Sequence, residues 1–125
     1  MAPAKRPFTV SIPESKKYVL TVLHEPMTHA MTVAYLEEVK RLGKELPKPR
    51  FLFDARGAPD VRSTLEDYEI YDFAKAFGFP GAKIAVITDP SDKSYDFTDV
   101  VACNAGYEHR LFIDEQEARD WLTTP

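Results

Sequence analysis

The predicted fold rests first on the segment Arg50-Phe51-Leu52-Phe53-Asp54-Ala55-Arg56-Gly57. Residues 50–54 are short and largely apolar, which is typical of a strand buried in a parallel sheet. Residues 55–59 include Gly57 and Pro59 and predict a turn. Ligands of α/β folds usually bind where such strands end, so Asp54 is a candidate site residue and Arg56 its candidate partner.

Strands and helices alternate on both sides of this segment. Further strands are predicted at residues 8–12, 18–23, 82–88 and 109–113. Helices are predicted from Thr28 to about Lys44, from Ser63 or Thr64 to Gly78, between Asp92 and Gly106, and after the cap formed by Asp114 with Glu117. The order β-β-α-β-α-β-α-β-α predicts an α/β fold with a mixed, mainly parallel five-stranded sheet and helices on its faces.

The domain organisation is simple. Residues 1–7 hold two prolines and no periodic pattern, so we expect a flexible N-terminal arm before a single domain at residues 8–125. Helical spacing predicts the buried side chains as Met31, Tyr35, Val39 and Leu42 in the first helix, Ile70, Phe73, Ala74 and Phe77 in the second, and Ala118, Trp121 and Leu122 in the last.

Three stretches, taken in order, resemble the SpoIIAA-like branch of the STAS superfamily, which is grouped with SEC14-like lipid-binding domains. They are the strand and turn at residues 51–57, the strand Lys83-Ile84-Ala85-Val86-Ile87-Thr88, and the final strand and helix at residues 106–122 with Glu117-Ala118 and Trp121-Leu122. The resemblance implies a SpoIIAA-like fold. It also implies a comparison with anti-sigma-factor antagonists, which are switched by phosphorylation within an Asp-Ser/Thr-x-Gly motif.

The corresponding stretch of this chain, residues 60–67, departs from that motif. Ser63 and Thr64 supply the hydroxyls, but the Asp just before them and the Gly just after them are missing. Both residues are therefore candidate phosphosites whose simpler interpretation is helix capping. Ser63 with Glu66 has the spacing of a capping box.

Composition excludes several classes of function. The 125 residues carry 16 Lys and Arg against 20 Asp and Glu, a net charge of −4 that argues against nucleic acid as a partner. No apolar run is long enough to cross a bilayer, so we expect no stable membrane anchoring and a soluble, cytoplasmic protein. The single cysteine, Cys103, excludes an internal disulfide and is interpreted as a packed, unreactive thiol.

No cofactor and no metal ion are expected. The histidines at positions 24, 29 and 109 lack the spacing of a zinc site, and the chain has no glycine-rich loop for phosphates or dinucleotides. Aromatic residues instead suggest a binding surface. Tyr68, Tyr71 and Phe79 exceed what the core of the second helix needs, and the acidic start of that helix favours a neutral, cationic or mostly apolar ligand.

Three functional hypotheses follow. The leading one is a non-enzymatic binding or regulatory module with a groove for a small apolar, lipid-like ligand or a partner protein, with a homodimer as a further form of assembly. The second is a phospho-switched signalling protein. The third is a small enzyme that uses Asp54, His24 and Arg56. The enzyme requires a polar pocket with a carboxylate and a histidine within hydrogen-bonding reach, whereas the binding module requires an apolar pocket.

Overall fold

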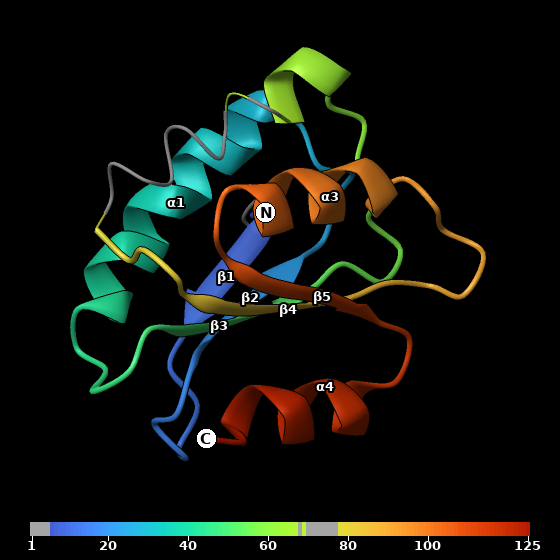
Figure 1. The fold of residues 1–125 in the computed structure, drawn as a ribbon. Coiled ribbons are helices and arrows are strands. Elements are labelled where there is room, and N and C mark those ends of the chain that lie inside the picture. The colour runs from blue at the N-terminus through green and yellow to red at the C-terminus, as the bar shows by residue number, and fades with distance from the viewer. Residues whose placement is uncertain (1–5, 68, 70–77) are drawn as a thin grey trace, which may run out of the picture.

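A computed structural model describes residues 6–67, 69 and 78–125, and within them a five-stranded sheet carries helices on both faces (Figure 1). The strands are β1 (Phe8–Ser11), β2 (Val19–Leu23), β3 (Arg50–Asp54), β4 (Lys83–Ile87) and β5 (Glu108–Phe112). The helices are α1 (His29–Gly43), α3 (Asp96–Asn104) and α4 (Glu115–Thr123), together with a helix that begins at Thr64.

The strands lie in the order β1-β2-β3-β4-β5. β1 pairs antiparallel with β2, and every later pair is parallel, with Phe51 of β3 opposite Val19 on one side and Ile84 on the other. The predicted mixed, mainly parallel sheet is therefore confirmed. The helices α1 and α3, which connect parallel strands, cover one face of the sheet, and the C-terminal helix α4 covers the other (Figure 1).

Local signals fix the ends of α1 as predicted. The backbone N–H of Met31 donates to Thr28 Oγ1 at 3.1 Å, which caps the N-terminus of the helix. The helix ends at Gly43, where tertiary packing requires a glycine. A Cβ atom there would lie 2.9 Å from Phe79 Cζ and 3.0 Å from Phe51 Cε1, so a larger residue would push these rings away.

The core has two halves, one on each face of the sheet. The larger half lies under α1 and α3 and includes Phe8, Val19, Leu23, Met31, Tyr35, Val39, Phe51 and Val86. The smaller half lies under α4 and includes Tyr18, Leu52, Ala85, Ile87, Phe112, Ala118 and Leu122. Leu42, predicted to be buried, is only partly buried at the margin of the larger half.

The prediction that α4 buries Trp121 is wrong. The helix buries Ala118 and Leu122, but Trp121 is only half-buried. Its ring packs against Phe112 with centroids 5.5 Å apart, and Lys83 Nζ lies 4.6 Å from the ring centre. Trp121 thus closes the edge of the smaller core while the ammonium group covers its face. The predicted buried stripe Ile70, Phe73, Ala74 and Phe77, and most of the predicted arm, lie outside the described residues.

Candidate functional site

The residues first expected to form a site, Asp54 and Arg56, bind each other at the end of β3. Arg56 Nη2 donates to Asp54 Oδ2 at 2.7 Å and Nε donates to Oδ1 at 2.9 Å. Arg56 also pairs with Glu115 at the start of α4, at 2.7 Å. The hydrogen bonds from Arg56 hold the pKa of Asp54 below its ordinary value. This arrangement orders the loop after β3.

The enzyme hypothesis gains no support at this edge. His24 is exposed, and although its charge helps to lower the pKa of Asp54, the Asp54 carboxylate is already bound by the guanidinium of Arg56. Asp89, which follows β4, accepts a hydrogen bond from the backbone N–H of Gly57 at 2.6 Å, so its carboxylate also serves the loop. Within residues 6–67, 69 and 78–125, no three His, Cys, Asp or Glu side chains are arranged to hold a metal ion.

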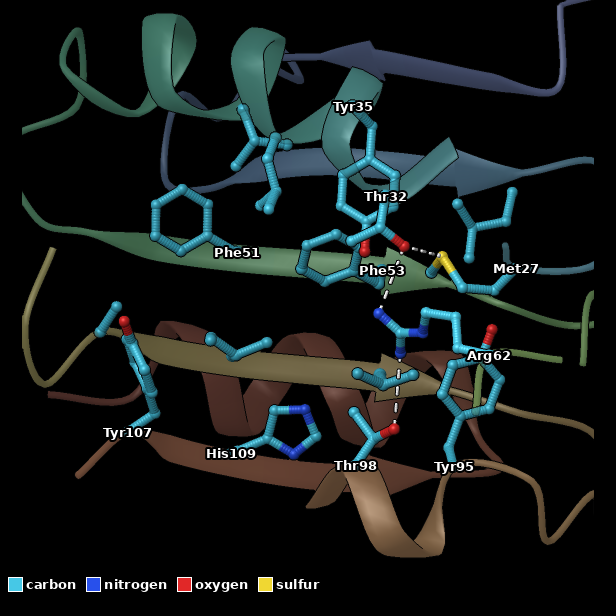
Figure 2. A pocket seen from close by; sticks show the side chains of 16 residues that line it. Met27, Thr32, Tyr35, Phe51, Phe53, Arg62, Tyr95, Thr98, Tyr107 and His109 are labelled. Atoms are coloured by element: carbon cyan, nitrogen blue, oxygen red, sulfur yellow. Dashed lines mark hydrogen bonds between the residues drawn. The ribbon is translucent and has the colours of Figure 1, made fainter. Parts of the chain in front are cut away.

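An apolar pocket of about 60 Å³ lies between the helices α1 and α3 and the sheet face that they cover (Figure 2). It is here named the α1–α3 pocket. Its apolar walls are formed by Leu23, Met27, Leu36, Val39, Phe51, Phe53, Ala82, Ile84 and Val86. Polar side chains among its lining residues are Thr32, Tyr35, Arg62, Tyr95, Thr98, Tyr107 and His109. The pocket is thus of the apolar kind that the binding hypothesis requires.

Arg62 places a cation in the wall of this pocket. The preceding loop is fixed to the chain before α1, because Met27 N donates to Pro59 O at 2.8 Å and Val61 N donates to Met27 O at 3.0 Å. The side chain of the next residue, Arg62, turns inward and only 2% of it is exposed. Figure 2 shows its guanidinium between Thr32 and Thr98.

The ion pair of Arg62 and Asp60 forms hydrogen bonds to both α1 and α3. Arg62 Nε donates to Asp60 Oδ1 at 2.9 Å, and Nη2 donates to Asp60 Oδ2 at 3.1 Å. Nη1 donates to Thr32 Oγ1 of α1 at 3.2 Å, while Thr98 Oγ1 of α3 donates to Asp60 Oδ2 at 2.9 Å. The Asp60–Arg62 pair therefore links α1 to α3 at one end of the pocket.

Asp67 is the third charged member of this cluster. Its Oδ1 lies 2.9 Å from Arg62 Nε, and 6% of its side chain is exposed. Burial, together with a hydrogen bond shared with Asp60, raises the pKa of Asp67 to about 7, although Arg62 opposes the shift. Burial also acts to raise the pKa of Asp60, but the hydrogen bonds and charge of Arg62 outweigh it and hold that pKa below its ordinary value. Below about pH 7, the two carboxyl groups therefore share one proton, which is lost as the pH rises through 7.

His109 enters the pocket from β5 and is held by α3. Its Nδ1 lies 2.8 Å from Asp99 Oδ1, and 1% of its side chain is exposed. Cys103, also on α3, donates to the backbone oxygen of His109 at 3.4 Å. The prediction that Cys103 is packed is wrong, because the residue is exposed on α3. Partial burial of the thiol and the nearby Asp99 still raise its pKa, which favours low reactivity.

The predicted binding aromatics are only partly described. Tyr68 and Tyr71 lie outside the described residues. The expectation that Phe79 has no place in the core is wrong, because its half-buried ring packs against Phe51 with centroids 5.3 Å apart. Its role in binding stays a prediction.

The sequence did not point to the α1–α3 pocket or to its charged cluster. Asp67 entered the prediction only as part of the acidic start of the second helix. A charged residue in a loop or first helical turn usually faces water, so nothing local in the sequence marked Asp60, Arg62 or Asp67 as buried.

Comparison with known proteins supports the fold. No model of a protein family matches the chain, and no curated protein does either. Among solved structures, the chain is similar to an uncharacterized protein from the DUF3478 family with a SpoIIAA-like fold, from Shewanella loihica PV-4. The TM-score is 0.66, the sequence identity is 19%, and the match covers 98% of each chain.

The chain therefore has a SpoIIAA-like fold, as its sequence predicted. In the part of the chain that the structure describes, no helix has the length and apolar character needed to cross a membrane.

Proposed function

We propose that this protein is a non-enzymatic binding or regulatory module that takes a small apolar ligand into the α1–α3 pocket. One observation carries the proposal, namely a mostly apolar cavity built against the sheet with a buried guanidinium in its wall. Binding pockets for small molecules usually combine apolar walls with a few fixed polar groups. The wall of this pocket has the same composition.

The size of the pocket limits what it holds. A volume of about 60 Å³ is less than half that of an apolar cavity of roughly 150 Å³, which is large enough to bind benzene. The pocket thus accommodates a group of a few non-hydrogen atoms, such as a small molecule or the end of an alkyl chain. A lipid-like ligand would place only its chain end there.

The same size sets the expected affinity. The best very small ligands gain about 1.5 kcal/mol per non-hydrogen atom, so four atoms give at most about 6 kcal/mol, a dissociation constant in the tens of micromolar. Millimolar binding is the realistic expectation for a probe of this size. Nuclear magnetic resonance detects such affinities, and methyl groups of Val39, Ile84 and Val86 report directly from the pocket wall.

The test is a titration of the full chain with acetone, a Y-shaped molecule of four non-hydrogen atoms. We expect saturable shifts of the Val39, Ile84 and Val86 methyl resonances. Ala82, which is 1% exposed and lines the pocket, provides a blocking variant, because Ala82→Leu fills the cavity. Ala30 is exposed on α1, so Ala30→Leu adds the same atoms outside the pocket.

The variants separate pocket binding from general effects of the solute. Ala82→Leu should abolish the saturable shifts, and Ala30→Leu should retain them. If wild-type protein shows no saturable shift at these methyl groups, or if Ala82→Leu binds as well as wild type, the α1–α3 pocket is not the binding site and the proposed function is wrong.

A further inference from the structure

The buried guanidinium of Arg62 has more hydrogen-bond donors than the described residues around it accept from. A guanidinium carries five N–H groups, two of them on Nη1. Nη1 has one acceptor within residues 6–67, 69 and 78–125, Thr32 Oγ1 at 3.2 Å. The second bond from Nη2, to Thr98 Oγ1, is long at 3.5 Å. Arg62 lines the pocket, and Figure 2 shows the guanidinium among the lining side chains.

The charge around Arg62 is already balanced. Asp60 contributes one carboxylate, and Asp67 lies 2.9 Å from Arg62 Nε with a pKa raised to about 7 by burial and by the hydrogen bond with Asp60. The three groups together carry a net charge between zero and −1 near neutral pH. An anionic ligand would therefore lose its hydration without meeting a net positive charge.

A cationic ligand is disfavoured for a different reason. Asp60 and Asp67 bind Arg62, but they are not among the described residues that line the pocket. The group that a ligand meets at this end is the guanidinium itself. The positive charge of the guanidinium in the pocket wall repels an ammonium group and attracts an oxygen acceptor.

We infer that the α1–α3 pocket selects an uncharged, mostly apolar group that carries one oxygen acceptor, such as a ketone, ester or ether, bound with that oxygen toward Arg62. This inference rests on the proposed function and names the class of ligand. An apolar group of the same shape leaves one N–H donor of Arg62 without an acceptor among the described residues. Because a hydrogen bond to a charged group contributes about 1.5–3 kcal/mol, the oxygen should improve binding about 10- to 100-fold.

Four Y-shaped probes with four non-hydrogen atoms each test this selectivity. Acetone carries a neutral acceptor, isobutane carries none, isopropylammonium is a cation and acetate is an anion. Each is titrated into the full chain at pH 7.5, with the methyl resonances of Val39, Ile84 and Val86 as the readout. We expect acetone to bind at least tenfold more tightly than isobutane, and both charged probes to bind more weakly than acetone.

A second measurement needs no substitution in the charged cluster. The ¹⁵N and ¹H resonances of the Arg62 guanidinium should shift when acetone binds and stay nearly unchanged when isobutane binds. Ala82→Leu should remove both effects, and Ala30→Leu should preserve them.

The outcomes distinguish the two claims. If none of the four probes gives saturable shifts, the proposed function fails and this inference fails with it. If isobutane binds as tightly as acetone, or if acetate or isopropylammonium binds more tightly, the pocket is a binding site but the inference about its ligand is wrong. If acetone binds without shifting the Arg62 resonances, the inference is wrong as well.

Discussion

Arg62 and Asp67 form an ion pair in the interior of the protein, with Arg62 Nε 2.9 Å from Asp67 Oδ1 and only 2% and 6% of the two side chains exposed. Arg62 precedes the helix that begins at Thr64, and Asp67 lies in the first turn of that helix. Their pairing draws the start of the helix toward α1 and α3, because the same guanidinium also binds Thr32 and approaches Thr98. This contact organises one end of the α1–α3 pocket.

Removing Arg62 should be strongly destabilising. Arg62→Met keeps much of the volume but leaves two buried carboxyl groups without their cation, and breaking a buried ion pair in this way costs about 3–5 kcal/mol. Arg56 provides the matched control, since 42% of its side chain is exposed in its ion pair with Asp54. Arg56→Met should cost no more than about 1 kcal/mol. Urea unfolding measures both values, and equal costs would contradict the assignment of Arg62 to the interior.

The raised pKa of Asp67 predicts how stability changes with pH. Its pKa is about 7 in the folded protein and near the ordinary value of 3.8 in the unfolded chain, so the folded state binds more protons between these values. The free energy of unfolding contributed by Asp67 is therefore complete below about pH 4 and is lost as pH rises through 7. Asp54 and Asp60 have lowered pKa values, and their contributions are instead lost as pH falls below about 4.

The variant Asp67→Asn isolates the contribution of Asp67 to the pH dependence of stability. The three histidines are present in both proteins, so any contribution from them is the same in wild type and variant. Wild-type protein should lose more stability between pH 5 and pH 8 than the variant does, when each is unfolded by urea across that range. An unchanged pH profile in Asp67→Asn would show that Asp67 does not hold the shared proton.

Ser63 should act as a structural cap. Its Oγ accepts from Glu66 N at 3.1 Å, and Glu66 Oε1 accepts from Ser63 N at 2.9 Å, which completes the predicted capping box. Ser63→Ala should cost about 1 kcal/mol, whereas Ser63→Asp, itself a good cap, should be nearly neutral. Thermal unfolding of both variants checks this order. Stoichiometric phosphate on Ser63 or Thr64 in protein from its native cells would favour the phospho-switch instead.

Trp121 and Leu122 should differ in their effects on stability. Leu122 is fully buried under α4, so Leu122→Ala should cost about 2–5 kcal/mol. Trp121 is half-buried, so Trp121→Ala should fall below the 3–5 kcal/mol of a fully buried tryptophan, at about 2 kcal/mol. Urea unfolding gives the ranking, and a larger loss at Trp121 would show that its contacts with Phe112 and Lys83 dominate the docking of α4.

Cys103 should be dispensable and slow to react. Burial and Asp99 raise the pKa of its thiol, so less thiolate is present near neutral pH than on a free cysteine. Alkylation by iodoacetamide at pH 7.5 should be slower than that of free cysteine, and Cys103→Ala should bind acetone as wild type does. Faster alkylation would identify an activated thiol.

The periodicity of the sequence determined the order of the described elements and the mixed parallel sheet. Thr28, Ser63 with Glu66, and Asp114 with Glu117 were identified as helix starts, and the structure shows the expected capping hydrogen bonds at all three. Such signals can be read from sequence because each acts over three or four residues, within a single turn of helix.

The pocket and its charged cluster depended on the tertiary structure. Arg62 bonds to Thr32 and Thr98, which are 30 and 36 residues away in the chain, and the packing of α1 and α3 on one face of the sheet brings the three together. A charged side chain is expected to face water unless partners surround it. No local sequence pattern indicates that distant segments will provide such partners. The sequence therefore determined which elements form, and long-range packing decided that Arg62 and Asp67 lie inside, because only distant residues could provide the hydrogen bonds and charges that compensate their burial.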